Sequence, residues 1–163
     1  GGASEERADR FAAFGLSLGL GFQVRDDLLG IWGATETTGK AEADDIRRRK
    51  QSLPILILRA RGTAEERAWL DAQYGAAEIE EAGIRGVLDL LEKHEVRRDV
   101  ETRVAELHDE ARRGLESAAL PGENPSKEAL AALVAMLASR QHGAFNAFRA
   151  TGDRDDHLTA LAR

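Results

Sequence analysis

The apolar residues of this chain recur at helical spacing over almost the whole sequence. After Ser4, a residue type that suits a helix cap, apolar side chains follow at steps of three, four and seven residues, in a series from Phe11 to Leu29 that includes Phe14, Leu18 and Phe22. This spacing predicts a helix that begins near Ser4 and is buried along most of its length. No period-2 alternation runs beyond about four residues, so no strand is expected.

In the first half of the chain, two glycines, a proline and a capping-box pattern indicate how the helices pack and where they begin. Gly15 and Gly19 lie four residues apart on the first helix and would let another helix approach closely. Residues 53–58 are apolar enough for a strand, but we expect a buried helix, because the surrounding pattern is helical and no partner strand is evident; Pro54 is tolerated in a first helical turn. A capping-box pattern opens at Thr63 and predicts a short helix that stops near residue 75.

Three longer segments continue the helical pattern. We expect helices over residues 78–94 and 96–115, and a last core helix after the break at residues 121–125, capped by Asn124 or Ser126. Their apolar positions are Ile84, Val87, Leu88 and Leu91, then Val96, Val100, Val104, Leu107, Ala111 and Leu115, and finally Leu130, Leu133, Val134 and Leu137. The predicted fold class is all-α, a helical bundle.

Composition limits the classes of function. The chain has 163 residues, a net charge of −6 and no cysteine. The acidic balance argues against nucleic-acid binding, and the absence of cysteine excludes disulfides, thiolate metal sites and a cysteine nucleophile. No apolar run reaches about 18 residues, so stable membrane insertion is not expected. These features are typical of a cytoplasmic protein.

The chain starts at Gly1, and its single methionine is Met136. We therefore expect a processed product or a fragment of a longer protein. The four histidines, His94, His108, His142 and His157, share neither a helical face nor a metal-ligand spacing, so a zinc site is not expected. The tryptophans, Trp32 and Trp69, are predicted in the core, with the alternative that Trp32 lines an apolar pocket.

Two adjacent acids, Asp26 and Asp27, interrupt an otherwise apolar run that extends from residue 16 to residue 32. Charges placed in such a run need a partner. Magnesium prefers oxygen ligands, keeps several waters and is commonly held by one or two carboxylates together with substrate phosphates. The pair therefore predicts a magnesium and phosphate site rather than a cage made only of protein ligands.

Three further side chains can serve the same phosphate group. Lys40 follows Gly39 on an expected loop, and Lys50 ends the basic run that begins at Arg47. Both supply positive charge for phosphate oxygens, and the Gln23 amide can donate a hydrogen bond to them. Taken singly, each lysine is more often an ordinary surface residue, so the prediction rests on the ordered set.

That ordered set resembles the second aspartate-rich motif of trans-isoprenyl diphosphate synthases. The matching parts are Phe22-Gln23-x-x-Asp26-Asp27-x-x-Gly30, then Gly39-Lys40, then Asp45-Ile46-x-x-x-Lys50-Gln51-Ser52-Leu53-Pro54. One position departs from the family pattern, because Gly30 replaces its last aspartate. The resemblance covers residues 1–140, the later half of an isoprenoid synthase domain, and leaves residues 141–163 as a tail that is a packed helix, a partner-binding helix or partly disordered.

The resemblance implies an all-helical fold with an apolar cavity, and the condensation of an allylic diphosphate with isopentenyl diphosphate to a longer polyprenyl diphosphate. It implies Mg²⁺ as cofactor, with Asp26 as a direct ligand and Asp27 acting through water. It places Gln23, Lys40 and Lys50 on diphosphate oxygens. Gly30 cannot bind metal, which weakens the site without abolishing it, since the acid it replaces is expected to act through water.

The family's first aspartate-rich motif and its isopentenyl-diphosphate-binding residues have no match here, so we expect no turnover by this chain alone. Three functions remain open: the later half of a farnesyl- or geranylgeranyl-type synthase, a non-catalytic subunit that binds a catalytic partner, or a relative of class I terpene cyclases. A half-domain would expose apolar faces between Phe11 and Phe22 and between Pro54 and Leu58. A companion chain carrying the missing half, or a second copy of this chain, is expected to cover them.

Overall fold

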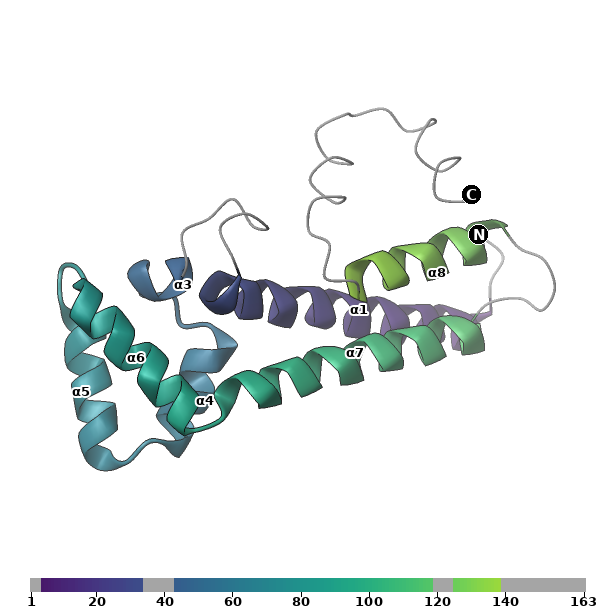
Figure 1. Cartoon of the computed structure of the whole chain (residues 1–163). Coiled ribbons are helices and arrows are strands. Elements are labelled where there is room, and N and C mark those ends of the chain that lie inside the picture. Colours follow the sequence, from purple (N-terminus) through teal and green to yellow (C-terminus); the bar gives the residue numbers. More distant parts are fainter. Residues whose placement is uncertain (1–3, 34–42, 119–124, 139–163) are drawn as a thin grey trace. The chain divides into compact units, whose positions relative to one another are not determined.

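A computed structural model describes residues 4–33, 43–118 and 125–138, and every regular element within these ranges is a helix (Figure 1). The all-α prediction is confirmed, as is the helical interpretation of residues 53–58. The helices are α1 (Glu5–Trp32), α3 (Asp44–Arg47), α4 (Leu53–Arg61), α5 (Ala64–Gly75), α6 (Glu81–Lys93), α7 (Val96–Ala118) and α8 (Pro125–Ala138).

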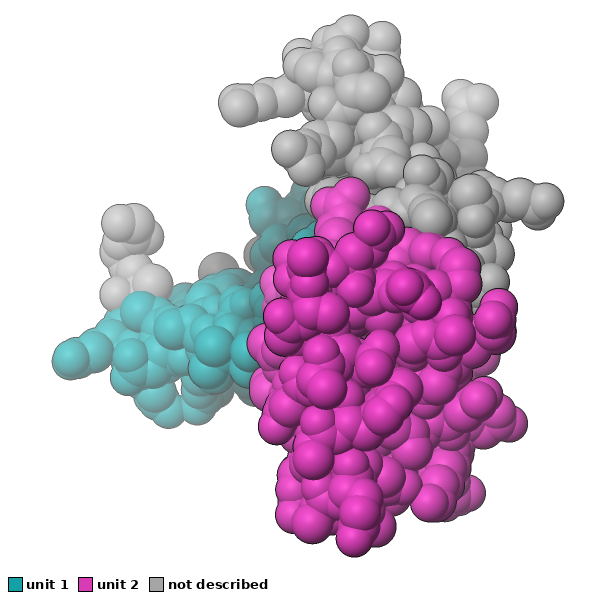
Figure 2. Space-filling model, turned by 90° about the vertical axis from the view of Figure 1, so that its left-hand side faces the viewer, with its two compact units in different colours: residues 1–22, 104–163 teal, residues 23–103 magenta. Residues whose placement is uncertain are grey.

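The chain forms two compact units, residues 23–103 and residues 1–22 with 104–163 (Figure 2). The first of these, which we call the motif unit, has a continuous apolar core. Both α3 and α4 pack against α6 within it. Its most deeply buried side chains are Ile31, Ile46, Ile55, Leu58, Leu70, Val87, Leu91, Val96 and Val100.

Helix α4 buries one face in the core of the motif unit. Pro54 stands in its first turn, where a missing N–H costs no helical hydrogen bond. Pro54, Ile55 and Leu58 are buried, while Leu56 is about half exposed. The expectation that the apolar face of Pro54–Leu58 would be left bare is therefore wrong, because Ile55 and Leu58 pack in one cluster with residues of α6.

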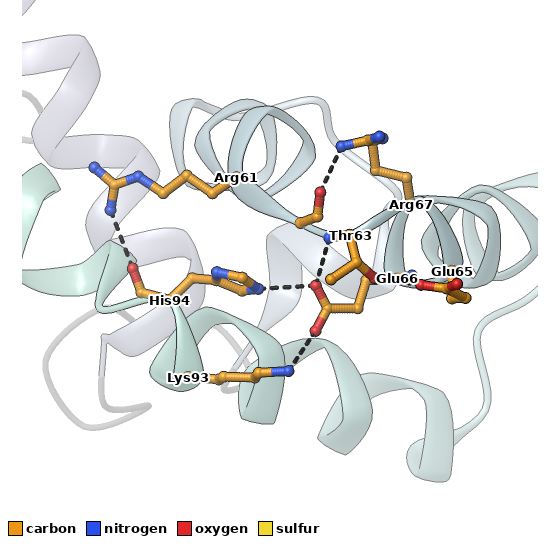
Figure 3. A network of polar contacts seen from close by, with 8 residues as sticks. Arg61, Thr63, Glu65, Glu66, Arg67, Lys93 and His94 are labelled. Atoms are coloured by element: carbon orange, nitrogen blue, oxygen red, sulfur yellow. Dashed lines mark hydrogen bonds and ion pairs between the residues drawn. The ribbon is translucent and has the colours of Figure 1, made fainter.

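The capping box at the start of α5 is confirmed. The Glu66 N–H donates to the Thr63 hydroxyl at 3.2 Å, and the Thr63 N–H donates to the Glu66 carboxylate at 2.8 Å. Figure 3 shows that the same carboxylate also meets the end of α6, where Lys93 Nζ lies at 2.7 Å and His94 Nε2 at 2.9 Å. Glu66 thus joins the start of α5 to the end of α6.

The second unit has a smaller core. Phe14 of α1, Ala111 and Leu115 of α7 and Val134 of α8 form one cluster, and Gly114 of α7 lies against Phe14. A Cβ at Gly114 would lie 3.3 Å from the Phe14 Cα. The backbones of α1 and α7 therefore come close here.

Much of the apolar surface of α1 remains outside this core. Phe11, Leu16 and Leu20 are 37%, 64% and 45% exposed, so the prediction of burial along most of the helix is wrong. An apolar helix needs cover on every side, whereas in the part of α1 that belongs to this unit the apolar side chains packed in the core are Phe14 and Leu18. Among the described residues, no atom of a neighbouring element lies within 4 Å of a Cβ built at Gly15 or Gly19, so no helix uses these glycines for close approach.

Four smaller expectations have different outcomes. Helix α8 begins at Pro125, so Ser126 lies inside its first turn and is not the cap; Asn124 lies outside the described residues. Trp32 is partly buried against the core as predicted. Trp69 is 37% exposed and rests on Gly86, so the prediction of a core position is wrong there. The tail, residues 141–163, also lies outside the described ranges.

Candidate functional site

Asp27 lies near the end of α1, in the motif unit, and its carboxylate is almost buried. Its Oδ2 accepts the Leu53 N–H at 2.9 Å, and its Oδ1 accepts the Gln23 side-chain amide at 3.2 Å. Leu53 is the first residue of α4, and the preceding Ser52 makes no side-chain cap bond. Asp27 therefore caps α4 from another helix, at the end where an anion is favoured.

Lys50 brings a positive charge to the same place. Its Nζ lies 2.9 Å from Asp27 Oδ1, 3.1 Å from Asp45 Oδ2 and 3.8 Å from Asp26 Oδ2. Partial burial lowers the pKa of Lys50, but hydrogen bonds and charge from Asp27 and Asp45 outweigh this effect, so its pKa lies above the usual value. Lys50 is therefore a firmly charged ammonium group among three carboxylates.

The backbone of the α3–α4 connection directs Lys50 to this position. Arg49 adopts a left-handed conformation (φ 55°) and ends the turn that follows α3. The Lys50 N–H then donates to the Asp45 carbonyl at 2.9 Å. The three preceding arginines have other partners: Arg47 pairs with Glu81, Arg48 pairs with Asp44, and Arg49 donates to the Ala76 carbonyl. In the basic run, the side chain that meets the motif carboxylates is Lys50.

Asp26 differs from its neighbour in exposure. Its side chain is 35% exposed, against 9% for Asp27, and Lys50 is its more distant partner at 3.8 Å. Of the two predicted metal ligands, Asp26 is the one more accessible to solvent.

The other two predicted phosphate ligands have different outcomes. Gln23 is exposed on α1, and its amide donates to Asp27. Lys40 lies outside the described residues. The structure therefore brings together Gln23, Asp26, Asp27 and Lys50, and it leaves the place of Lys40 undescribed.

Asp45 belongs to this group although the sequence analysis assigned it no role. It is the second residue of α3, is 5% exposed, and packs against Gly30. The Ala43 N–H donates to the Ile31 carbonyl at 3.2 Å, which anchors the start of α3 beside the end of α1. The sequence signal that could have found Asp45 is its place five residues before Lys50 in the matched motif, whereas its contact with Gly30 depends on tertiary packing.

These donors fit a magnesium ion that shares its coordination sphere with water and phosphate. Among residues 4–33, 43–118 and 125–138, no group of three histidine, cysteine or acidic side chains is arranged to hold a metal ion by itself. Asp26 offers exposed carboxylate oxygens, Asp27 is engaged by three protein donors, and Lys50 balances part of the negative charge. Such a site suits an ion that arrives with its own anionic ligand.

Comparison with known proteins identifies a family. The model of the polyprenyl synthetase family matches residues 1–91. A farnesyl diphosphate synthase of Mycobacterium tuberculosis is 38% identical over 94 residues, which cover 56% of this chain and 26% of the relative. The chain thus spans about a quarter of that curated relative.

Solved structures agree with this comparison. A polyprenyl synthetase from Streptomyces coelicolor matches with a TM-score of 0.72 at 31% identity, over 84% of this chain and 42% of the other. A polyprenyl synthase from Caulobacter crescentus, complexed with calcium and isoprenyl diphosphate, matches with a TM-score of 0.70 at 33% identity, over 86% of this chain and 42% of the other. The helical fold is therefore that of the isoprenoid synthases.

Proposed function

Because this chain belongs to the polyprenyl synthetase family, we propose that it supplies the second metal and diphosphate half-site of a prenyltransferase. The complete enzyme condenses an allylic diphosphate with isopentenyl diphosphate to a longer polyprenyl diphosphate. The observation that carries this proposal is the Lys50 ammonium held between Asp27 and Asp45, with the exposed Asp26 carboxylate 3.8 Å away. The related synthase that was solved with calcium and isoprenyl diphosphate supports this type of ligand.

The two motif aspartates take different parts in this half-site. Asp26 is the direct magnesium ligand, since its oxygens face solvent. Asp27 acts on the ion through water, because the Leu53 N–H, the Gln23 amide and the Lys50 ammonium already occupy its oxygens. Asp27 therefore positions Lys50 and the start of α4 around the ligand.

Gln23, Lys40 and Lys50 are the proposed partners of the diphosphate oxygens. The Lys50 side chain is 38% exposed, so its ammonium can reach an arriving anion while it remains near Asp27. Lys40 precedes α3 in the sequence and supplies a second positive charge in this proposal. Magnesium, when bound, would neutralise part of the diphosphate charge and polarise the bond to the departing group.

Turnover requires residues that this chain does not supply. The chain spans about a quarter of the curated relative and about two fifths of the solved synthases. We propose that it is inactive alone and that a companion polypeptide or a second copy completes the cavity. An active sample given only Mg²⁺ and both diphosphates would contradict this.

A second candidate is a non-catalytic subunit that retains the fold and binds a catalytic partner. Gly30 favours it, because this residue removes a carboxylate from the family motif. The two candidates differ in one respect: an inert subunit has no use for magnesium-dependent diphosphate binding.

Thermal unfolding in the presence of ligand separates the two candidates. Mg²⁺ with pyrophosphate at about 100 times Kd should raise the Tm of the wild-type chain by roughly 5 to 10 °C. Asp26→Asn should lose this rise and keep its ligand-free Tm. Asp44→Asn is the matched control, because Asp44 pairs with Arg48 outside the proposed site, and it should retain the rise. A rise that survives in Asp26→Asn would argue against the half-site.

A further inference from the structure

A groove lies between α5 and α6, and it shares no residue with the proposed half-site. Its volume is about 420 Å³, which is the size of a small binding pocket. Trp69 of α5 and Leu90 of α6 supply its apolar surface, and acidic side chains lie along its rim. The proposed function makes no use of this part of the motif unit.

The Trp69 ring is fixed in the groove by a glycine on the opposite helix. A Cβ at Gly86 would lie 2.7 Å and 2.9 Å from two carbons of the ring, so the ring rests directly on the backbone of α6. Glycine within a helix is less stable than alanine, and the contact with Trp69 gives a reason for it here. Trp69 is 37% exposed, so part of the ring remains open to a ligand.

Two carboxylates of the groove lack a basic partner. Glu66 is not one of them, because Lys93 Nζ lies 2.7 Å from its carboxylate (Figure 3). Glu65 accepts the Thr63 hydroxyl at 2.9 Å, which leaves its negative charge unbalanced. Asp89 is exposed on α6, and within the described part of the chain neither Glu65 nor Asp89 forms an ion pair. The groove therefore combines an aromatic ring with two unpaired negative charges.

We propose that this groove binds an arginine side chain of a partner polypeptide. A guanidinium group is attracted to the face of a tryptophan ring, and carboxylates accept paired hydrogen bonds from the same group. The methylene carbons of arginine suit the apolar surface at Leu90. Because Trp69 and both carboxylates are exposed, the groove would leave much of a free small molecule in water, whereas a polypeptide adds contacts outside the groove.

NMR titration with a blocked tripeptide, in which one arginine lies between two leucines, tests the proposal. The peptide should shift the Trp69 indole signal and the Gly86 amide signal of the ¹⁵N-labelled chain until both saturate. A peptide with citrulline in place of arginine has nearly the same shape without the charge. It should bind more weakly by roughly 2- to 30-fold, the range expected for the loss of two exposed ion pairs.

Variants of the chain test the same contacts from the other side. Glu65→Gln with Asp89→Asn removes both charges and should weaken binding of the arginine peptide by a similar factor. Glu78→Gln with Asp44→Asn is the matched control, because it removes two carboxylates of the motif unit outside the groove and should bind like the wild type.

Gly86→Ala keeps every charge and moves the ring. The new methyl group would displace Trp69, while alanine favours the helix, so the variant should remain folded and bind the arginine peptide more weakly. Gly75→Ala adds the same group at the end of α5, where no neighbouring atom of the described residues lies within 4 Å of the new Cβ. This control should bind like the wild type.

Three results would overturn the proposal. One is equal affinity for the arginine and citrulline peptides, and another is unchanged affinity in the variant that lacks both rim charges. The third is binding of methylguanidine alone as tightly as the peptide, because the groove would then be a site for small molecules. Each of these results would leave the proposed magnesium and diphosphate half-site untouched, since the groove contains none of its residues.

Discussion

Asp26 and Asp27 project about 100° apart around the axis of α1, as adjacent residues of a helix do. One carboxylate consequently faces solvent, and the other meets the first N–H of α4. Asp26, the proposed metal ligand, contributes little to the fold. Its neighbour Asp27 connects α1 to Lys50 and Leu53. The two functions of the motif are therefore separable by substitution.

Substitution of Asp27 should destabilise the chain, and substitution of Asp26 should not. Asp27→Ala leaves the Leu53 N–H without its acceptor and removes the nearest of the three carboxylates around Lys50, at a cost of about 2 to 4 kcal/mol. Asp26→Ala removes an exposed group and should change the unfolding free energy by less than about 0.5 kcal/mol. Denaturant unfolding followed by circular dichroism measures both values, and similar losses for the two variants would refute this division.

At the scale of single residues, sequence reasoning predicted side chains that the structure brings together, but it missed one of their neighbours. Gln23, Asp26, Asp27 and Lys50 were recognised from their order, and the structure brings them together. Asp45 was assigned no role, because its contribution depends on a space that opens only when α3 lies beside Gly30. Such a space depends on tertiary packing and does not follow from the spacing of residues.

At the scale of elements, α5 and α6 are joined through one carboxylate. Lys93, then the Thr63 N–H and then His94 stabilise the Glu66 anion, and together they lower the pKa of Glu66 from 4.5 to about 2. Because the folded-state pKa is lower than the unfolded value, this contribution is present in full above pH 4.5. It is lost as the pH falls from about 4.5 towards 2.

Glu66→Gln should therefore reduce the dependence of the unfolding free energy on pH below pH 4.5. The unfolding free energy of the wild-type chain should fall more steeply between pH 4.5 and 2 than that of the variant. Lys93→Gln removes the largest cause of the pKa shift, so its slope should lie between the other two. Chemical unfolding at several pH values measures the slopes, and parallel profiles for all three proteins would contradict the prediction.

The helix boundaries differ in how far the sequence determines them. The α5 capping box depends on residues three apart, so Thr63 and Glu66 were enough to predict it. The start of α4 is capped by Asp27, which lies 26 residues before Leu53 in the chain. A local sequence pattern cannot predict a contact between residues so far apart. Burial of α1 was overestimated for a related reason, since an apolar period indicates that a face can be covered but not that a neighbour is present to cover it.

At the scale of the whole molecule, the exposed apolar side chains of α1 require an explanation. Leu16 and Leu20 are four residues apart on one helix and are 64% and 45% exposed. Contiguous exposed apolar surface of this kind usually marks an interaction site. Within the described residues, no helix is long and apolar enough to cross a membrane. We expect Leu16 and Leu20 to contact another polypeptide.

Leu16→Glu with Leu20→Glu should reduce association of the purified chain. Sedimentation velocity over a range of concentrations measures it, and the wild-type chain should show larger species whose fraction falls by several-fold in the variant. Leu56→Glu is the matched control, because Leu56 is 51% exposed on α4 of the motif unit. Equal association of all three proteins would show that the α1 side chains are not the contact.

The proposed function requires that this chain carries a diphosphate site that depends on magnesium. Its most direct test is calorimetric titration of pyrophosphate into the wild-type chain, once with Mg²⁺ and once with a chelator. Binding with Mg²⁺ and none with the chelator is the predicted result, because Asp26 and Asp27 repel the anion unless a divalent cation is present. Equal binding under both conditions, or none under either, would contradict the claim.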